Sequence, residues 1–406
     1  MRQQYINILK NCNFTAFWIG MFAFKLADNL FTIGLFWWIL KATESEVILS
    51  IVGAMAFAPM LIFSLLSGAL IDRFDRRRLL ATSALIRGML IPLIPLLHYL
   101  GLLNMWHVYL LAFIQGTAST FFFTASSAII PQLVSQDSLM AANSLIDVSA
   151  WTGNIIGFLA GGILVESLGA MNLLTATLFL LLVSALSIFL IKFSSNRIRV
   201  NVSFSTIVGD MEKGLNAIKK DKAILTFIVT WMGIQMLFAG GPMSIGWPVL
   251  SEKILNAGPE GYGLLVVAIS VSALLGSFVI GQWGANKSIG HTIMVGFLWG
   301  AIGMFMFTLA DTLWIALTIA ALWNLCYPMI NVPFMTAVQE RISEDELGTV
   351  FGASNMISSF MTPISMLMTG FIMQRLSIIA PFQLFALALG ICSIIIYIVK
   401  EARTAR

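Results

Sequence analysis

Residues 68–78 read GALIDRFDRRR and join two long apolar segments. The run Arg76 to Arg78 is typical of a cytoplasmic loop in any multispan membrane protein, because lysine and arginine collect on that side. That tendency does not account for Gly68 or Asp72. A glycine lets a helix approach its neighbour closely in lipid, and a carboxylate suits the amino end of a facing helix, where unpaired N–H groups favour an anion. The stretch therefore predicts a close helix contact with an ionic latch at the membrane edge.

The composition of the chain places its apolar segments in lipid. Of 406 residues, 59% are hydrophobic and 10% are charged, whereas soluble domains carry roughly 25% charge. The basic residues form no nucleic-acid footprint. Cys12, Cys326 and Cys392 fit neither a disulfide framework nor a structural zinc site. We expect an all-α integral membrane protein with no metal and no nucleic-acid partner.

Apolar segments long enough to cross a bilayer, about 20 residues each, recur along the whole chain. They cover residues 14–40, 47–71, 79–97, 106–130, 139–165 and 170–191, and then 223–250, 262–284, 291–309, 313–338, 347–373 and 379–399. A polar, basic stretch separates the two sets of six. We predict an N-terminal six-helix half over residues 1–192, a linker over 193–222 and a C-terminal six-helix half over 223–406.

The orientation of these spans follows from the sorting of basic residues. One set of loops holds most of the lysines and arginines, and the other holds only Lys41, Lys253 and Arg375. Cytoplasmic loops carry the excess, so we predict that both termini and the linker are cytoplasmic in a plasma or inner membrane. Apolar residues at helical spacing between Phe204 and Ile218 predict a linker helix at the inner membrane surface, with a tethering or a regulatory role.

With this layout, the loop at residues 68–78 resembles the signature G-x-L-x-D-R-x-x-R-R of the major facilitator superfamily. Its D-R-x-D-R-R form is similar to that of the macrolide-efflux and enterobactin-exporter group. The resemblance implies two pseudo-symmetric six-helix bundles, a drug:proton antiporter mechanism and alternating access. It also implies that span eleven, which begins near Gly348, faces Asp72, with Arg73, Arg76 and Arg77 as further gating residues. On this view Asp72→Asn abolishes transport and leaves the protein folded.

Charged side chains inside spans are expensive in lipid, so each one is a candidate functional residue. Lys25, Asp28, Asn29 and Thr32 share one face of span one. Two alternatives stay open for them. Either Lys25 and Asp28 form a structural ion pair, or Asp28 couples transport to protons, because burial disfavours a charged carboxylate. Asp147 in span five is the second candidate for proton coupling, with a role as a loop partner as its alternative.

Two further features of the first half concern spans three and five. Arg87 lies inside span three, where we expect it to snorkel or to pair with an acid such as Asp147 rather than to bind a solute. Gly153, Gly157, Gly161 and Gly162 form a small-residue seam in span five, and such seams allow tight helix contacts.

Amide, hydroxyl and aromatic side chains share faces in several spans. The predicted substrate-binding residues are Lys25, Asn29, Thr32, Gln115, Phe122, Trp151, Asn154, Trp231, Gln235, Phe238, Asn324, Tyr327 and Asn331. Rings with a few hydrogen-bonding groups suit an amphipathic organic solute better than a bare ion. Pro242 and Pro248 in span seven, and Pro328 and Pro333 in span ten, are candidate hinges.

These patterns together favour a secondary transporter over an enzyme. The sequence has no Walker loop and no histidine cluster, so we expect no cofactor and a proton gradient as the energy source. We predict a monomeric, lipid-embedded efflux transporter for an amphipathic solute, such as a macrolide or a siderophore-like metabolite, in the manner of multidrug resistance. One alternative is an exporter or flippase of lipid-like or anionic metabolites, with Lys25 and Arg87 as anion contacts. The other is a non-transporting receptor or scaffold.

Overall fold

The computed structural model describes residues 8–71, 75–135, 138–192, 204–283 and 288–405. These residues form helices and no strands, and the structure has 12 helical stretches long and apolar enough to cross a membrane. Each stretch coincides with one of the apolar segments predicted from the sequence. The expected all-α, multi-pass architecture is therefore confirmed.

The chain divides into two compact units. Unit 1 comprises residues 1–43 and 55–202, and unit 2 comprises residues 44–54 and 203–406. The predicted division into residues 1–192, 193–222 and 223–406 stays a prediction. The compact units differ from it in assigning residues 44–54, at the start of the second span, to the unit of the C-terminal helices.

Unit 1 is built around its first helix. Its elements are α2 (Cys12–Thr43), most of α3 (Glu46–Ile71), α4 (Arg76–Leu90), α5 (Leu93–Tyr99), α6 (Met105–Leu133), α7 (Leu139–Leu168) and α8 (Ala170–Phe189). Helix α2 packs along both α7 and α8, and α4 packs against α6 and α8. The third span is broken between α4 and α5, where Pro92 lacks the N–H that a continuous helix needs.

The predicted glycine seam of span five is confirmed at the contact between α2 and α7. A Cβ atom added to Gly157 would lie 2.7 Å from Cβ of Asn29, and one added to Gly161 would meet Ile33. Gly153 faces the stem of Lys25 at 3.3 Å in the same way. The absence of side chains on this face of α7 brings the polar face of α2 directly against it.

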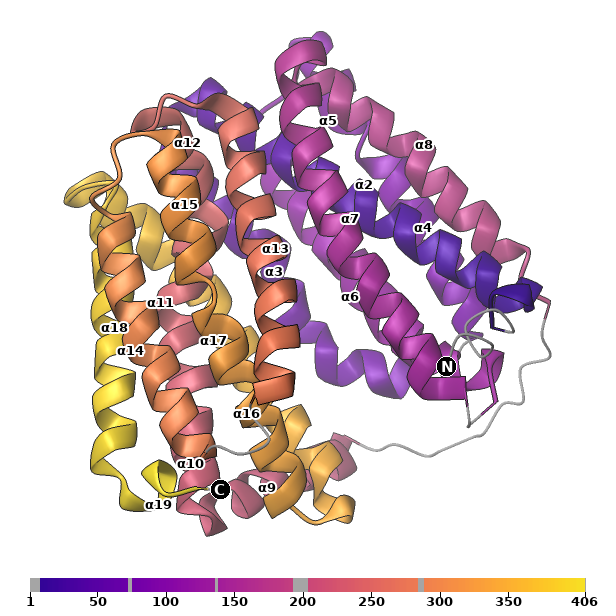
Figure 1. Cartoon of the computed structure of the whole chain (residues 1–406). Helices are drawn as coiled ribbons and strands as arrows, with labels where there is room; N and C mark the ends of the chain where they lie inside the picture. Colours follow the sequence, from indigo (N-terminus) through magenta and orange to yellow (C-terminus); the bar gives the residue numbers. More distant parts are fainter. Residues whose placement is uncertain (1–7, 72–74, 136–137, 193–203, 284–287, 406) are drawn as a thin grey trace. The chain divides into compact units, whose positions relative to one another are not determined.

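Unit 2 holds the remaining helices. They are α9 (Phe204–Lys220), α10 (Lys222–Ile228), η2 (Val229–Gln235), α11 (Met236–Gly241), η3 (Pro242–Gly246), α12 (Trp247–Lys253), α13 (Gly258–Trp283), α14 (Ile289–Phe307), α15 (Leu313–Trp323), α16 (Cys326–Arg341), α17 (Glu344–Arg375), α18 (Ala380–Ile398) and α19 (Lys400–Arg403). Figure 1 shows the orange α14 beside the yellow α18, and α11 packs against α17.

Two spans of unit 2 depart from regular α-helix near the candidate hinge prolines. Span seven runs from α10 to α12 through two π-helical segments, η2 and η3, and η3 begins at Pro242. Span ten stops at Trp323 and resumes at Cys326, just before Pro328. Pro328 has no N–H to offer the carbonyl of Asn324, which instead accepts a bond of 3.0 Å from the N–H of Tyr327. A hinge role for these breaks stays a prediction.

The linker helix predicted from the sequence is present as α9, and it packs against α17. A Cβ atom at Gly214 would collide with the backbone carbonyl of Thr349, and Ala217 and Ile218 are buried. The contact face of α9 therefore consists of small and apolar residues. Its regulatory or tethering role stays open.

The C-terminal residues pack against the start of α14. The N–H of Gly290 donates to the carbonyl of Ala405 at 3.2 Å, and the Ser288 hydroxyl donates to the same carbonyl at 2.8 Å. A side chain at Gly290 would collide with the carbonyl of Ala402. The first turn of α14 thus donates hydrogen bonds to the C-terminal residues and packs closely against them.

Candidate functional site

Arg87 lies at the centre of a buried hydrogen-bonded network in unit 1. Arg87 is 1% exposed, and its Nη1 lies 2.7 Å from Oδ1 of Asp28. The same guanidinium donates through Nε to Oε1 of Gln115 at 2.9 Å and through Nη1 to Oγ of Ser119 at 2.5 Å. The amide of Gln115 in turn donates to the backbone carbonyl of Arg87 at 3.2 Å. The four side chains form one hydrogen-bonded network inside the spans.

Aromatic rings form the apolar wall of this network. The guanidinium carbon of Arg87 lies 4.8 Å from the ring centroid of Phe24 and 5.7 Å from that of Phe31. Cation–π attraction of this kind strengthens where water is excluded. Phe24 is itself stacked on Phe122, with ring centroids 3.5 Å apart. Phe122, predicted to bind substrate, is fully buried in this wall.

Three helices bring the network together. Asp28 comes from α2, and Arg87 lies in the last turn of α4, where a cation complements the carboxyl end of the helix. Gln115 and Ser119 are four residues apart on α6 and so face the same direction. A change in the charge of Asp28 therefore acts on the packing of α2, α4 and α6 together.

The structure identifies the ionic partners of Asp28 and Arg87. Asp28 is in an ion pair, but its closest cation is Arg87, while Nζ of Lys25 lies 3.9 Å away. Arg87 pairs with an acid as expected, but Asp28 takes the place that the sequence suggested for Asp147. Asp147 is exposed on α7. Thr32 lies one turn after Asp28 on α2, and its hydroxyl donates to the backbone carbonyl of Asp28 at 2.8 Å.

Two of the predicted substrate-binding amides meet each other. Asn29 is 3% exposed, and its Nδ2 donates to Oδ1 of Asn154 at 3.1 Å and to the carbonyl of Gly153 at 3.0 Å. Both residues of α7 belong to the glycine-lined contact with α2. Trp151 lies half-buried on the same helix. The predicted binding roles of Asn29, Trp151 and Asn154 stay predictions.

A small cavity lies beside this network in unit 1. It is lined by Trp18, Met21, Phe22, Lys25, Phe123, Ile146, Ser149 and Ala150, which come from α2, α6 and α7. The Lys25 ammonium lies 6.0 Å from the ring centroid of Phe123. The cavity therefore combines ring surfaces with one charged group.

Trp231 of span seven, predicted to bind substrate, contacts aromatic rings of two other spans in unit 2. The ring of Trp231 lies 5.7 Å from that of Tyr327 and 6.2 Å from that of Phe297. Gln235, one turn after Trp231 in η2, has a buried Oε1 that finds no hydrogen-bond partner within the described chain. Span ten adds the half-buried Asn331 on α16.

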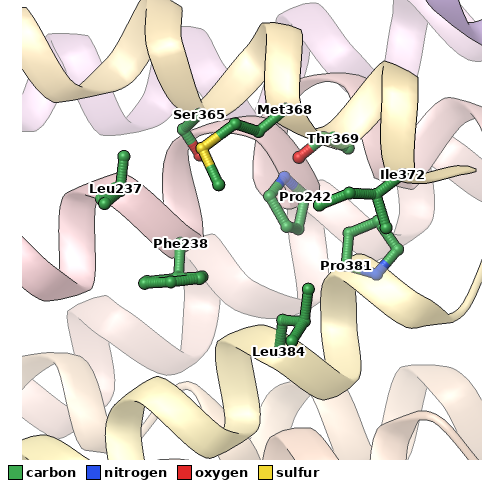
Figure 2. Close-up of a pocket in the computed structure, with 9 residues that line it drawn as sticks. All are labelled: Leu237, Phe238, Pro242, Ser365, Met368, Thr369, Ile372, Pro381 and Leu384. Carbon is green, nitrogen blue, oxygen red and sulfur yellow. The ribbon is translucent and has the colours of Figure 1, made fainter.

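Another small cavity in unit 2 lies between α11, η3, α17 and α18. Figure 2 shows Leu237, Phe238, Pro242, Ser365, Met368, Thr369, Ile372, Pro381 and Leu384 around it. The Ser365 hydroxyl accepts a bond of 2.7 Å from the N–H of Gly241, so it serves the packing of α11 on α17. Asn324, at the break in span ten, donates to the carbonyl of Ile269 at 2.8 Å. Of the predicted binding residues, Phe238 alone lines this cavity.

The predicted gating loop is described only in part. Asp72, Arg73 and the surroundings of Gly68 lie outside the described residues. Nη1 of Arg76 donates to the carbonyl of Ala128 at 2.7 Å, and Nη1 of Arg77 donates to that of Ile191 at 2.6 Å. At Gly348 in α17, an added Cβ would meet no atom within 4 Å. The ionic latch therefore stays a prediction.

Comparisons with known proteins agree with the fold and the loop motif. The family model for the Major Facilitator Superfamily matches residues 17–366 and 243–406. Macrolide efflux protein A of Streptococcus pyogenes is 20% identical over 406 residues, which cover 96% of each chain. The multidrug efflux pump Tap of Mycolicibacterium fortuitum is 21% identical over 93% of each chain.

Solved structures share the fold at low sequence identity. The nucleoside transporter NupG aligns with a TM-score of 0.76 at 12% identity, covering 95% of this chain and 99% of its own. A bacterial homologue of the iron transporter ferroportin, in an inward-facing state, gives a TM-score of 0.76 at 13% identity, with 95% and 97% covered. The chain therefore belongs to the Major Facilitator Superfamily, as a multi-pass membrane transporter.

Proposed function

We propose that this protein exports an amphipathic small molecule by alternating access, driven by the proton gradient. The family supplies the transporter fold, and two relatives along nearly the whole chain are named as efflux proteins. The observation that carries the coupling proposal is the pairing of Asp28 with Arg87 inside the spans of unit 1. An ionisable pair at that depth is costly, and a role in ion coupling explains its presence.

Asp28 is the proton carrier in this proposal. Its side chain is 24% exposed, whereas that of Arg87 is 1% exposed, so we assign protonation to the carboxylate. Protonation removes the charge of Asp28 and so weakens its attraction to the guanidinium. Arg87 then keeps its bonds to Gln115 and Ser119 on α6. Proton binding is thereby converted into a looser contact between α2 and the pair α4 and α6.

The proposed function also includes the other residues and properties predicted from the sequence. Asp147 is the second candidate for proton coupling. The predicted substrate-binding residues contact the solute during transport, and the latch at Asp72 closes the cytoplasmic side. The protein works as a monomer in the plasma or inner membrane, with both termini cytoplasmic and no bound cofactor.

Transport in inverted membrane vesicles tests this function. We expect the wild type to move a fluorescent amphipathic dye when a pH gradient is imposed, and to stop when a protonophore is added. Asp28→Asn should lower the gradient-driven rate at least tenfold. Glu166→Gln is the matched control, because Glu166 is an exposed acid at the far end of α7. Unchanged gradient-driven transport by Asp28→Asn would assign coupling to another acid, with Asp147→Asn the next variant to measure.

A double variant separates coupling from simple charge neutralisation. Asp28→Asn combined with Arg87→Gln removes both charges and leaves a polar amide at each position. If the pair only neutralises itself, this variant should fold and keep gradient-driven transport. If Asp28 carries the proton, the variant should fold but retain only exchange down the gradient of the solute. A scaffold without transport activity would show no flux in any of these measurements.

A further inference from the structure

We propose that the cavity beside Lys25 binds the apolar part of an organic anion, with the ammonium of Lys25 contacting its acidic group. This proposal rests on the proposed export function and names the charge class of the solute. The cavity lies in unit 1 and is walled by α2, α6 and α7. Its ligand is an amphipathic monoanion with an aromatic or branched apolar body and a carboxylate or sulfonate group.

The balance of charge in the network leaves Lys25 as the surplus cation. Asp28 is one anion, and Arg87 and Lys25 are two cations. Arg87 lies 2.7 Å from the carboxylate and Lys25 lies 3.9 Å from it, so Arg87 is the partner that neutralises Asp28. The set of three therefore carries a net charge of one positive unit. A surplus charge within a span is costly unless water or a counterion compensates it.

The hydrogen-bonding groups of the cavity point to the same ligand chemistry. Lys25 is the only charged residue among those that line the cavity. The indole N–H of Trp18 donates to the carbonyl of Leu145 at 3.2 Å, and the Ser149 hydroxyl donates to that carbonyl at 2.8 Å. Both donors are therefore used inside the protein. The ammonium of Lys25 is left as the cavity's charged donor, and it suits an anion.

The remaining walls of the cavity favour an apolar body of restricted size. Phe22, Phe123 and Met21 contribute ring and thioether surfaces, which bind apolar groups without directional bonds. The cavity is small, so only the tip of the apolar body enters it while the rest of the ligand extends out of it. An amphipathic amine fits less well, because its charge would be repelled by Lys25 where water is scarce.

Binding of three matched ligands to the full-length protein in lipid nanodiscs tests this inference. The ligands share one naphthyl skeleton and carry a carboxylate, a primary amide or a primary amine. We expect the wild type to bind the carboxylate at least tenfold more tightly than the amide, and the amine most weakly. Lys25→Met should weaken binding of the carboxylate at least tenfold and leave the amide within twofold. Lys25→Arg should keep most of the preference for the carboxylate.

Two further variants guard against a folding defect. Lys41→Met removes a lysine from the end of the same helix, outside the cavity, and should leave the binding of all three ligands unchanged. Ala150→Phe fills the cavity without changing its charge, and it should weaken all three ligands together. Equal or tighter binding of the amine, no binding of any ligand to the wild type, or an equal loss of all three in Lys25→Met would overturn the proposal.

The same ligands distinguish this inference from the proposed function. If vesicles export the amine in a protonophore-sensitive way and ignore the carboxylate, the exporter stands and the anion site is wrong. If the carboxylate binds as expected but no ligand or dye moves with the gradient, the site stands and the export function is wrong.

Discussion

The interiors of the two units hold different chemistry. Unit 1 buries Arg87 against Asp28 in a hydrogen-bonded network. Unit 2 buries an aromatic cluster in which Trp247 stacks on Phe307 at 5.3 Å and lies 6.4 Å from Trp323. In unit 2, the ion pairs of Lys220, Lys222, Lys253 and Arg341 are at helix ends. The buried N–H groups of both tryptophans have no hydrogen-bond partner within the described residues.

The two interiors respond differently to a change of charge. An ion pair changes strength when one partner is protonated, whereas ring packing does not respond to pH. The buried ion pair of unit 1 is therefore sensitive to protonation, whereas the aromatic core of unit 2 is not. The predictions below test this contrast.

The largest expected effect is at the buried arginine. Arg87→Leu leaves Asp28 without its closest cation, and breaking a buried pair costs about 3–5 kcal/mol. We expect the lower part of that range, because Asp28 is partly exposed. Thermal unfolding in detergent measures the change. Lys220→Leu is the comparison in unit 2, because its pair with Glu346 is exposed and should contribute less than about 1 kcal/mol. An equal loss of stability in Arg87→Leu and Lys220→Leu would contradict the difference between the two units.

The next effect concerns the glycine contact of unit 1. Gly157→Ala places a methyl group 2.7 Å from Cβ of Asn29, so the helices must separate. Overpacking of this kind costs about 1–3 kcal/mol. Gly352→Ala in α17 is the control, because an added Cβ there meets no atom within 4 Å. There the substitution should raise stability by up to about 1 kcal/mol, since alanine is the better helix former. A neutral Gly157→Ala would contradict the tight contact.

A smaller effect separates two buried phenylalanines. Phe24→Leu and Phe307→Leu remove the same atoms from fully packed sites, but Phe24 also contacts the guanidinium of Arg87. We expect Phe24→Leu to destabilise more, by about 0.5–2 kcal/mol, the usual contribution of a cation–π contact. Chemical denaturation in detergent gives both values. The extra destabilisation by Phe24→Leu should vanish when both substitutions are made in an Arg87→Gln background. If it persists there, the contact with the guanidinium is not its cause.

The smallest effect is a pH dependence in unit 2, outside the spans. Hydrogen bonding by the backbone, together with the nearby Lys222 ammonium, holds the pKa of Glu401 below its ordinary value. The carboxylate therefore stabilises the fold fully above that ordinary value, and the contribution is lost as pH falls through the lowered pKa. Comparing the unfolding temperature of wild type and Glu401→Gln from pH 7 to pH 3 should show a gap that closes only at the acid end. A gap that widened on acidification would have the wrong sign.

The sequence predicts the architecture well and the ionic network only in part. Span length and composition depend on neighbouring residues in the chain, so the 12 spans and the glycine contact of α7 could be read directly. The Asp28 to Arg87 pair depends on the relative rotation of α2 and α4, which no local pattern encodes. The i, i+4 spacing of Gln115 and Ser119 was the available signal, because it marks a polar strip on α6 that an arginine can reach.

For some residues the sequence predicts the kind of role but not the contacts they make. Aromatic residues are so frequent in this chain that the partners of Phe24 could not be selected from the sequence. The breaks in spans three and ten follow from proline chemistry, but the π-helical form of η2 has no comparable local cause in the residues Val229–Gln235.

The hydrogen bonds from Ser288 and Gly290 to the carbonyl of Ala405 restrict how this protein can be engineered. Deleting the residues from Ala402 onward would uncover the opening turn of α14 and leave two donors without acceptors. Purification tags and reporter fusions are therefore better joined through a flexible spacer that leaves residues 402–405 in place.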